Sequence, residues 1–335
     1  MHIVVSDFGI SLGKKSERLL LRQKGAVIGE APFRDIEQIT IVSKGVSLST
    51  DVIRECVEYG IQINFLSFSG KPYAKLSSPN LTGTVITRRE QILAYADHRG
   101  VELAKAFVEG KIKNQANILK YFAKYRRAKN PETYQDISRL VGEIDRVRSQ
   151  LSSLDAPRIE EIRGQLLAVE GRAAQHYWDG LKILVADHID FEGRERRGAL
   201  DPFNSTLNYG YGILYNQIWG AINLAGLDAF AGYLHSDRPG KPSLVLDLVE
   251  EFRPIIVDRV VVAMTNKGIA LEVDDNGLSQ ETRREIAKRV MERLNAEESY
   301  NGKKYKLQAV IQMQARRIAS FLRGETKYKP FVGGW

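Results

Sequence analysis

A histidine and three acidic residues lie close together in the stretch HSDRPGKPSLVLDLVEEFRPIIVD, residues 235–258. His235 stands in a turn rich in proline and glycine, and the apolar segment after it carries Asp247, Glu250 and Glu251. Side chains three and four residues apart share one face of a helix, so we expect these acids to project from one side. Carboxylate oxygens with one imidazole suit Mn²⁺ or Mg²⁺, and less exclusively Zn²⁺. The stretch is therefore a candidate metal site.

Salt bridges would account for the same residues without a metal ion. Arg238 precedes the acids and Arg253 follows them. Like charges at helical spacing repel by roughly 0.2–0.5 kcal/mol for each pair, and an arginine between them offsets that repulsion. The spacing alone leaves the metal site and the salt-bridge cluster both open.

Glu170 is a further acid in an unusual setting. It follows the apolar run Leu-Leu-Ala-Val and precedes the small residues Gly171, Ala173 and Ala174. The apolar neighbours predict that Glu170 is at least partly buried, and a buried charge needs a partner. Arg172 or a metal ion would be that partner, and the spacing favours Arg172.

An acid-free basic run, KIKNQANILKYFAKYRRAK, occupies residues 111–129. Lysine and arginine neutralise phosphates, and the interleaved aromatic residues would stack on unpaired bases. A solvated helix face whose aromatic residues pack in the core explains the run equally well. A second basic cluster lies in a predicted loop. The candidate DNA-binding residues are Lys111, Lys113, Lys120, Lys124, Arg126 and Arg127 in the run and Arg194, Arg196 and Arg197 in the loop.

The elements that must position these residues fall into two parts. Residues 1–80 contain short segments rich in Val, Ile, Leu and Phe, separated by turns, which predict a small β-sandwich. One helix interrupts them, capped by Ser49 or Thr50 and ended at Gly60. Residues 81–87 are expected to be a linker. Residues 88–335 show helical periodicity and predict a larger, all-helical domain, with two helices between 279 and 323 and a loosely held tail.

Composition limits the class of protein. The chain has 335 residues, 43% of them hydrophobic and 27% charged, which is typical of a globular protein with two domains. A net charge of +8 favours a polyanionic partner such as nucleic acid. The sequence shows no apolar run near the ~20 residues of a membrane span, and we expect no signal peptide. With Cys56 as its single cysteine, the chain has no internal disulfide, and we expect a cytoplasmic protein.

Four motifs occur in a fixed order: LLAVEGRAAQHYW, LNYGYGILY, GYLHSDRPGKPSLVLDLVEEFRPIIVDRVV and KYKPF. With the β-rich start, they resemble the CRISPR-associated spacer-acquisition integrases, the Cas-one family, over nearly the whole chain. The resemblance implies an α+β fold, with a β-domain that dimerises and a helical catalytic domain. It also implies a complex with the small ferredoxin-like Cas-two partner. Family members join DNA fragments with 3′ ends to CRISPR repeat DNA, assisted by Mg²⁺ or Mn²⁺, in the prokaryotic cytoplasm.

The resemblance also assigns roles to residues. The positions of the family's metal ligands match Glu170, His235 and Glu250, and a supporting acid matches Asp247. The basic positions near the scissile phosphate match Arg238 and Arg253. The last ligand is often aspartate in the family, whereas this chain has two adjacent glutamates. Glu250 lies three residues from Asp247 and fifteen from His235, which matches the spacing in the family, so the resemblance favours Glu250 and leaves Glu251 as the alternative.

Two other functions compete with integration. A stand-alone metal-dependent nuclease would use the same ligands, and a non-catalytic nucleic-acid-binding scaffold would show the same basic composition. The scaffold does not explain the acids, because carboxylates repel phosphates unless a metal intervenes. Product analysis separates the nuclease from the integrase.

Overall fold

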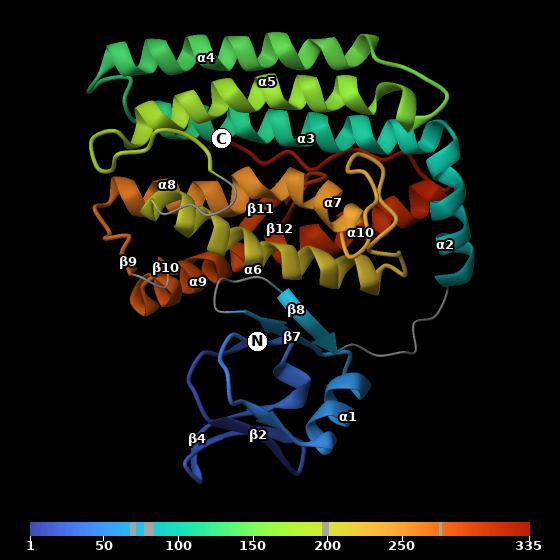
Figure 1. Ribbon diagram of the computed structural model, residues 1–335, viewed down its shortest axis with the longest axis vertical. Helices are drawn as coiled ribbons and strands as arrows, with labels where there is room; N and C mark the ends of the chain where they lie inside the picture. The colour runs from blue at the N-terminus through green and yellow to red at the C-terminus, as the bar shows by residue number, and fades with distance from the viewer. Residues whose placement is uncertain (68–71, 77–83, 196–200, 275–276) are drawn as a thin grey trace. The chain divides into compact units, whose positions relative to one another are not determined.

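The computed structural model describes residues 1–335 except 68–71, 77–83, 196–200 and 275–276 (Figure 1). The chain divides into two compact units, Met1–Thr82 and Gly83–Trp335. The first unit is rich in strands and the second in helices, which confirms the predicted fold class. No helix in the described ranges is long and apolar enough to cross a membrane.

The N-terminal unit contains two four-stranded sheets that share one hydrophobic core. One sheet has the order β1-β5-β7-β8, with β8 antiparallel to β7 and the others parallel. The other has the order β4-β3-β2-β6. The strands are β1 His2–Val5, β2 Ile10–Lys15, β3 Arg18–Gln23, β4 Ala26–Pro32, β5 Gln38–Ile41, β6 Ser47–Leu48, β7 Gln62–Leu66 and β8 Pro72–Leu76.

The described part of this unit has a single α-helix, and it lies where the sequence placed it. Helix α1 spans Thr50–Glu58, and the Ser49 hydroxyl accepts a hydrogen bond from the backbone N–H of Val52. Gly60 follows the helix with φ +69°, a left-handed conformation that glycine adopts without a steric penalty. Val52 and Cys56 bury the inner face of the helix against the core.

The C-terminal unit is built from nine α-helices within its described residues. Helices α3, α4 and α5 pack against one another, and α7 packs against α3 and α6 (Figure 1). A π-helical turn at Pro254–Asp258 joins α7 to α8. The helices are α2 Thr84–Leu93, α3 His98–Ala123, α4 Pro131–Ser149, α5 Ile159–Val185, α6 Pro202–Leu224, α7 Ser243–Arg253, α8 Arg259–Asn266, α9 Gln280–Asn295 and α10 Leu307–Leu322.

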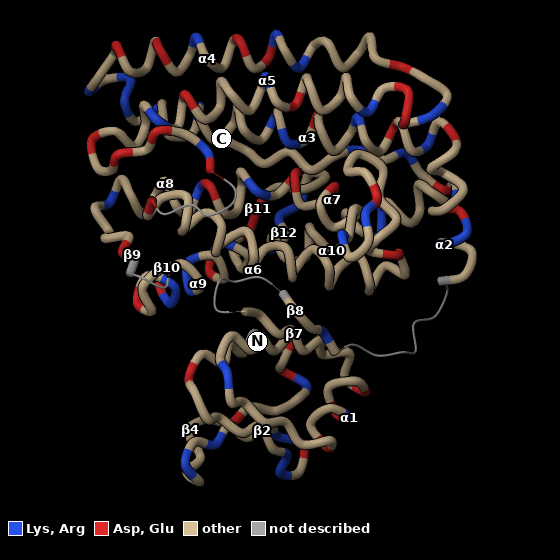
Figure 2. The backbone as a smooth tube through the Cα atoms, in the orientation of Figure 1, with Lys and Arg blue, Asp and Glu red and all other residues tan. Residues whose placement is uncertain are grey.

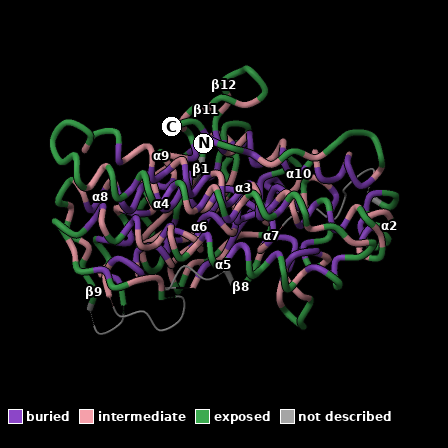
Figure 3. The backbone as a smooth tube through the Cα atoms, turned by 90° about the horizontal axis from the view of Figure 1, so that it is seen from above, coloured by how far each residue is buried: buried purple, intermediate pink, exposed green. Residues whose placement is uncertain are grey.

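Burial separates the inner from the outer helices of this unit. The inner faces are buried, whereas acidic and basic residues follow one another along the outer helix α4 (Figures 2 and 3). Phe107, Tyr177 and Phe252 are among the largest fully buried side chains. The candidate site therefore lies among helices whose positions are fixed by packing.

Three features of this unit differ from expectation. Residues from Thr84 onward are helical, so the predicted linker 81–87 is too long, and its residues 81–83 lie outside the described part. The unit is not all-helical, because hairpins form from β9 Val273–Asp274 with β10 Gly277–Leu278 and from β11 Glu297–Tyr300 with β12 Lys303–Lys306. The third feature is the chain's C-terminal tail, residues 323–335, which docks against α7.

Candidate active site

Asp247 holds the histidine loop in place. Its carboxylate, fully buried on α7, accepts hydrogen bonds from the backbone N–H groups of Tyr233, Leu234 and His235, at 2.6, 3.0 and 2.9 Å. The Nδ1 atom of His235 lies 2.8 Å from the same carboxylate. A carboxylate only accepts, so Nδ1 carries the proton and Nε2 keeps its lone pair for a ligand.

A glycine makes this close approach possible. A Cβ atom on Gly232 would lie 2.5 Å from the backbone carbon of Ser243 and 2.8 Å from Asp247 Oδ2. Both contacts are shorter than any real side chain makes. The loop that carries the histidine can therefore pack against the first turn of α7 only with glycine at this position.

Glu170 and Glu250 come from different helices and meet at one cation. Glu170 is on α5, Glu250 is on α7, and both carboxylates contact Nζ of Lys111 on α3. The distance from Lys111 Nζ to Glu250 Oε2 is 2.6 Å. Arg253 contacts the other oxygen of Glu250. The exposed fractions of Lys111, Glu170 and Glu250 are 7, 8 and 2%, so this cluster is almost closed to solvent.

Close packing of α3 on α7 brings Lys111 to the acids. A Cβ on Gly110 would lie 3.0 Å from Cγ of Glu251 and 2.7 Å from Cβ of Pro330. Glycine at 110 thus lets α3 approach both α7 and the C-terminal tail. The next residue along α3 is Lys111, whose side chain then reaches Glu250.

The cations control the ionisation of Glu250. Burial acts to raise the pKa of this carboxyl, but Arg253 and Lys111 outweigh it and hold the pKa at about 2. Burial acts to lower the pKa of Lys111, but Glu170 and Glu250 raise it above its ordinary value. Glu250 is therefore a carboxylate and Lys111 an ammonium at neutral pH.

Glu251 points into a different network. Its carboxylate accepts hydrogen bonds from the Tyr328 hydroxyl, from the Gln314 amide at 2.9 Å and from the backbone N–H of Phe331 at 2.9 Å. Burial raises the pKa of Glu251 to about 7, although these donors act to lower it. Phe331 also stacks on the Phe252 ring, with centroids 5.3 Å apart. Glu251 thus fixes the tail, which is not loosely held as the sequence predicted.

The donor set suits a divalent cation, although a lysine now lies within it. Among the described residues, no three His, Cys, Asp or Glu side chains are gathered closely enough to hold a metal as they stand. The Lys111 ammonium instead lies between Glu170 and Glu250 as a stand-in cation. Two buried carboxylates and an imidazole with Nε2 available are ligands for Mg²⁺ or Mn²⁺. The residues present therefore fit the metal.

Glu170 has a different partner from the one its spacing favoured. The sequence pointed to Arg172, but that side chain is exposed and donates to the Gln150 amide oxygen at 2.6 Å. The partner is Lys111, 59 residues away along the chain. The sequence placed Lys111 among the DNA-binding residues, and the structure buries its side chain between two acids.

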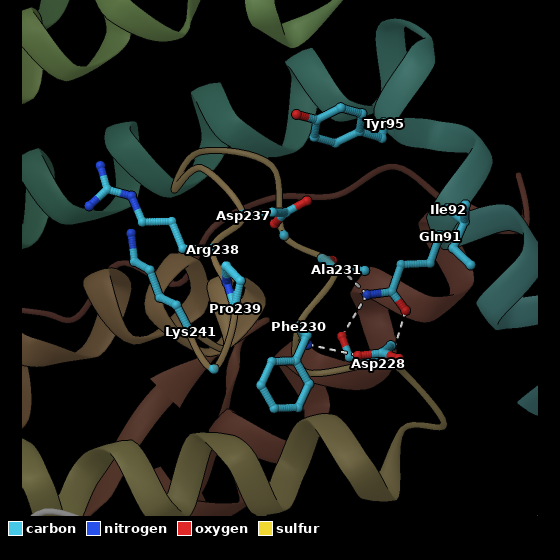
Figure 4. Close-up of a pocket in the computed structure, with 12 residues that line it drawn as sticks. Gln91, Ile92, Tyr95, Asp228, Phe230, Ala231, Asp237, Arg238, Pro239 and Lys241 are labelled. Carbon is cyan, nitrogen blue, oxygen red and sulfur yellow. Dashed lines mark hydrogen bonds between the residues drawn. The ribbon is translucent and has the colours of Figure 1, made fainter.

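The two arginines assigned to the scissile phosphate lie in different surroundings. Arg253 contacts Glu250, and its guanidinium lies over the ring of Tyr211 with 4.9 Å to the centroid. Arg238 is exposed and extends beside Lys241 at a pocket of about 580 Å³ (Figure 4). The Gln91 amide closes one side of this pocket through hydrogen bonds to the backbone. The pocket borders the histidine loop on its α2 side.

The basic run crosses the end of α3, and its cations differ in exposure. Lys113 pairs with a neighbouring acid on α3, and Arg126 pairs with Asp187 at 2.9 Å. Lys120 is half-buried, 5.7 Å above the Trp335 ring. The exposed cations stacked on tyrosine rings are Lys124 and Arg127.

The second basic cluster is described only in part. Arg194 donates hydrogen bonds to Asn204 and Asn208 on α6 and lies over the rings of Trp178 and Tyr211. The structure thus gives Arg194 a packing role inside the unit. Arg196 and Arg197 lie outside the described residues.

A buried acid that the sequence did not single out lies behind Arg253. Asp258, in the π-helical turn, accepts hydrogen bonds from the hydroxyl groups of Tyr177, at 2.7 Å, and Tyr211. Burial raises the pKa of Asp258 to about 6, against the effect of both hydroxyls. The sequence signal was the apolar run Pro-Ile-Ile-Val directly before an acid, the same signal that marked Glu170.

Comparison with known proteins gives consistent matches over the chain. The model of the family described as CRISPR associated protein Cas1 matches residues 3–292. A protein of Archaeoglobus fulgidus named CRISPR-associated endonuclease Cas1 1 is 36% identical over 352 residues, with 100% of both chains covered. A casposase bound to integration product has a TM-score of 0.80 and 27% identity, covering 99% of this chain and 93% of that one. A chain of a Cas6-RT-Cas1–Cas2 complex, 18% identical with a TM-score of 0.76, shares the fold over 99% of this chain and 36% of that chain.

Proposed function

The chain belongs to the Cas1 family of CRISPR-associated proteins, as its motifs predicted, and we propose that it is a DNA integrase and endonuclease of CRISPR adaptation. It would insert short foreign DNA fragments into the CRISPR array by attack of a fragment's 3′-hydroxyl on a phosphodiester. The observation that carries the proposal is the convergence of Glu170 and Glu250 from two helices on Lys111. Helix α7, which carries Glu250, also carries Asp247, and Asp247 holds the imidazole of His235 by Nδ1. The similarity to a casposase bound to integration product supports joining.

We propose that Glu170, His235 and Glu250 hold Mg²⁺ or Mn²⁺. When bound, the cation supplies Lewis-acid polarisation of a phosphoryl oxygen and stabilises the attacking or leaving alkoxide. Asp247 orients the imidazole and fixes its tautomer, as outer partners of metal-binding histidines do. Arg253 lies next to Glu250 and would offset charge on the phosphate during the reaction. Arg238, exposed in the histidine loop, would hold DNA as it enters.

The proposed partners follow from the family and from charge. We propose a homodimer, because an N-terminal unit of about 80 residues is small for an independently stable core, and a complex with Cas2. Light scattering at micromolar concentration should give the dimer mass, and a monomer mass would contradict the proposal. The place of action would be the prokaryotic cytoplasm, where the CRISPR array lies.

DNA is expected to contact the helical unit through cations of the basic run that are exposed or half-buried. Reversing the charge of Lys120, Lys124 and Arg127 should weaken binding and flatten the dependence of log affinity on log salt, by about 0.9 for each phosphate that the variant no longer neutralises. Fluorescence anisotropy of a labelled duplex at several salt concentrations measures both effects. Unchanged affinity would show that the run is only a solvated face.

Product analysis tests the proposed reaction. A labelled duplex with 3′-hydroxyl ends is incubated with a supercoiled plasmid carrying a CRISPR repeat, with Mn²⁺ or with EDTA. Integration predicts a label joined covalently to the plasmid, and no joining when the fragment ends in a 3′-dideoxynucleotide. Nicked plasmid without joined label would identify a stand-alone nuclease. Equal joining in EDTA would contradict the metal.

A further inference from the structure

Lys111 is the one cation in the described residues that touches both candidate metal-binding carboxylates. Its ammonium lies between Glu170 and Glu250, and the side chain is 7% exposed. Lysine carries a compact charge on a flexible four-carbon stem, so its ammonium can leave and re-enter a small site by rotation about the stem. The residue therefore occupies the space that a cation shared by the two carboxylates would need.

The charges of the cluster are already balanced. The two carboxylates of Glu170 and Glu250 face the two cations Lys111 and Arg253. Adding a divalent cation to this cluster would leave a large excess of positive charge in surroundings almost closed to water. Such an excess is strongly unfavourable where the dielectric is low. A metal ion can bind well only if a resident cation moves away.

Arg253 is the less suited of the two to leave. Its guanidinium is also held over the Tyr211 ring, and it contacts one oxygen of a single acid. Lys111 bridges the two acids that come from separate helices. The position between the ligands belongs to Lys111.

We propose that Lys111 is a resident counter-ion that keeps Glu170 and Glu250 paired in the metal-free protein and is displaced by the divalent cation. This inference rests on the metal site of the proposed function. Lys111 acts through the two carboxylates, so it is a positioning residue. Because Lys111 must be displaced, the protein binds the metal less tightly than the same ligands would without the lysine. The DNA-free protein then holds the metal weakly. A DNA phosphate placed beside Arg253 and the displaced ammonium would offset the excess positive charge, and the metal would then bind more tightly.

The test is the metal affinity of Lys111→Met, measured by isothermal titration of the full-length, DNA-free protein with MnCl₂. We expect Mn²⁺ to bind about tenfold more tightly or better than to the wild type, because no cation has to leave. A merely structural lysine would give the opposite result, since its loss would disorder the ligands and weaken binding. Lys113→Met, two residues along α3 and paired with Glu109, is the matched control and should keep the wild-type affinity.

Lys111→Gln provides a second measurement if the methionine variant does not fold. Its unfolding midpoint should rise more on adding saturating Mn²⁺ than the wild-type midpoint does, because the metal relieves two unpaired carboxylates. An unchanged or weaker Mn²⁺ affinity in Lys111→Met, or an equal or smaller rise in Lys111→Gln, would overturn the inference. Failure of the wild type to bind Mn²⁺ at all, with Glu170→Ala indistinguishable from it, would instead overturn the metal site on which the inference rests.

Discussion

Glu250 and Glu251 are neighbours on α7, and both are buried, yet they are compensated in opposite ways. Glu250 meets the cations Lys111 and Arg253, and its pKa is held at about 2. Glu251 meets uncharged donors from the chain's C-terminal region, and burial raises its pKa to about 7. A carboxylate paired with cations stays ionised and can exchange one cation for another. A carboxylate satisfied by uncharged donors fixes a segment of the fold.

Asp258 belongs to the second kind. Its two oxygens accept from the hydroxyl groups of Tyr177 and Tyr211, and burial raises its pKa to about 6. The helical unit thus contains buried acids of two classes within a dozen residues of one another. Cationic partners mark Glu250 as a candidate ligand, and uncharged partners mark Glu251 and Asp258 as structural acids. The spacing of the acids along the chain does not make this distinction.

The largest expected effect separates the two neighbours directly. Glu250→Gln keeps the shape of the side chain but removes the charge, and should lower the rate of strand transfer by about a thousandfold. Glu251→Gln keeps an oxygen for the donors of the tail and should leave the rate within about threefold of the wild type. Joining of a labelled fragment to the repeat plasmid measures both rates.

Glu170→Gln and His235→Ala extend this test to the other proposed ligands. Each should match the loss in Glu250→Gln while circular dichroism and the unfolding midpoint show an intact fold. The assignment is wrong if His235→Ala is fully active. A loss confined to Glu251→Gln would show that the ligand is the second of the two adjacent acids.

A smaller loss, of metal affinity, is expected on replacing Asp247, which lies one turn earlier on α7. Asp247→Asn cannot accept from three backbone N–H groups and orient the imidazole as a carboxylate does, so metal affinity should fall by about 10–100-fold. Titration with Mn²⁺ measures this loss without DNA. His235→Asn in the same assay gives the effect of losing the imidazole itself. If Asp247→Asn bound the metal as tightly as the wild type, the role of Asp247 would be confined to folding the loop.

Part of the fold and of the candidate site could be predicted from the sequence. The apolar positions of α1 and α7, the caps at Ser49 and Gly60, and the β-then-α division follow local patterns, and the structure agrees with them. The burial of Glu170 also follows from its apolar neighbours. Local periodicity reports which face of a helix is buried, and it does so for any helix with a solvated side.

The partners of the buried acids were not accessible, because they come from distant parts of the chain. Lys111 is 59 residues from Glu170, and Phe331 is 80 residues from Glu251. A lysine in a basic run carries no local sign that it is buried. The packing of α3 on α7 at Gly110 decides this, and that packing is tertiary.

One missed element did have a local signal. The β11–β12 hairpin turns at Asn301-Gly302, both with positive φ, at 51° and 79°. Asn-Gly between two strand-forming segments is a strong signal for a two-residue hairpin. The helical periodicity on either side led to the expectation of helices throughout, which left no place for a hairpin between them.

The structural role of Glu251 predicts a loss of stability. Glu251→Ala leaves the buried Phe331 N–H without its acceptor and removes one of the acceptors of the Gln314 amide, which should lower the free energy of unfolding by about 2 kcal/mol. Urea denaturation measures this, and limited proteolysis should cut the tail sooner. Glu297→Ala, at an exposed acid of the β11 strand, is the control and should change stability little. Equal unfolding free energies for the two variants would show that Glu251 does not stabilise the fold.

The smallest expected effect is a loss of unfolding free energy as pH rises, which only a buried acid with uncharged donors shows. The pKa of Asp258 is about 6 in the folded protein against an ordinary value of 3.8, so folding favours its protonated form. Its contribution to stability is complete below pH 3.8 and is lost as pH rises through 6. Glu250 has the opposite sign, because its contribution is present above pH 4.5 and is lost only as pH falls through about 2.

Asp258→Asn tests this sign, since the amide keeps an acceptor for a tyrosine hydroxyl and does not titrate. Between pH 5 and pH 7 the wild type should lose about 1 kcal/mol more unfolding free energy than Asp258→Asn, measured by urea denaturation at each pH. Other titrating groups contribute to both proteins and cancel in the difference. Parallel profiles of unfolding free energy against pH would show that Asp258 is ionised throughout this range. The tyrosine hydroxyls would then stabilise a charge, as Lys111 and Arg253 do at Glu250.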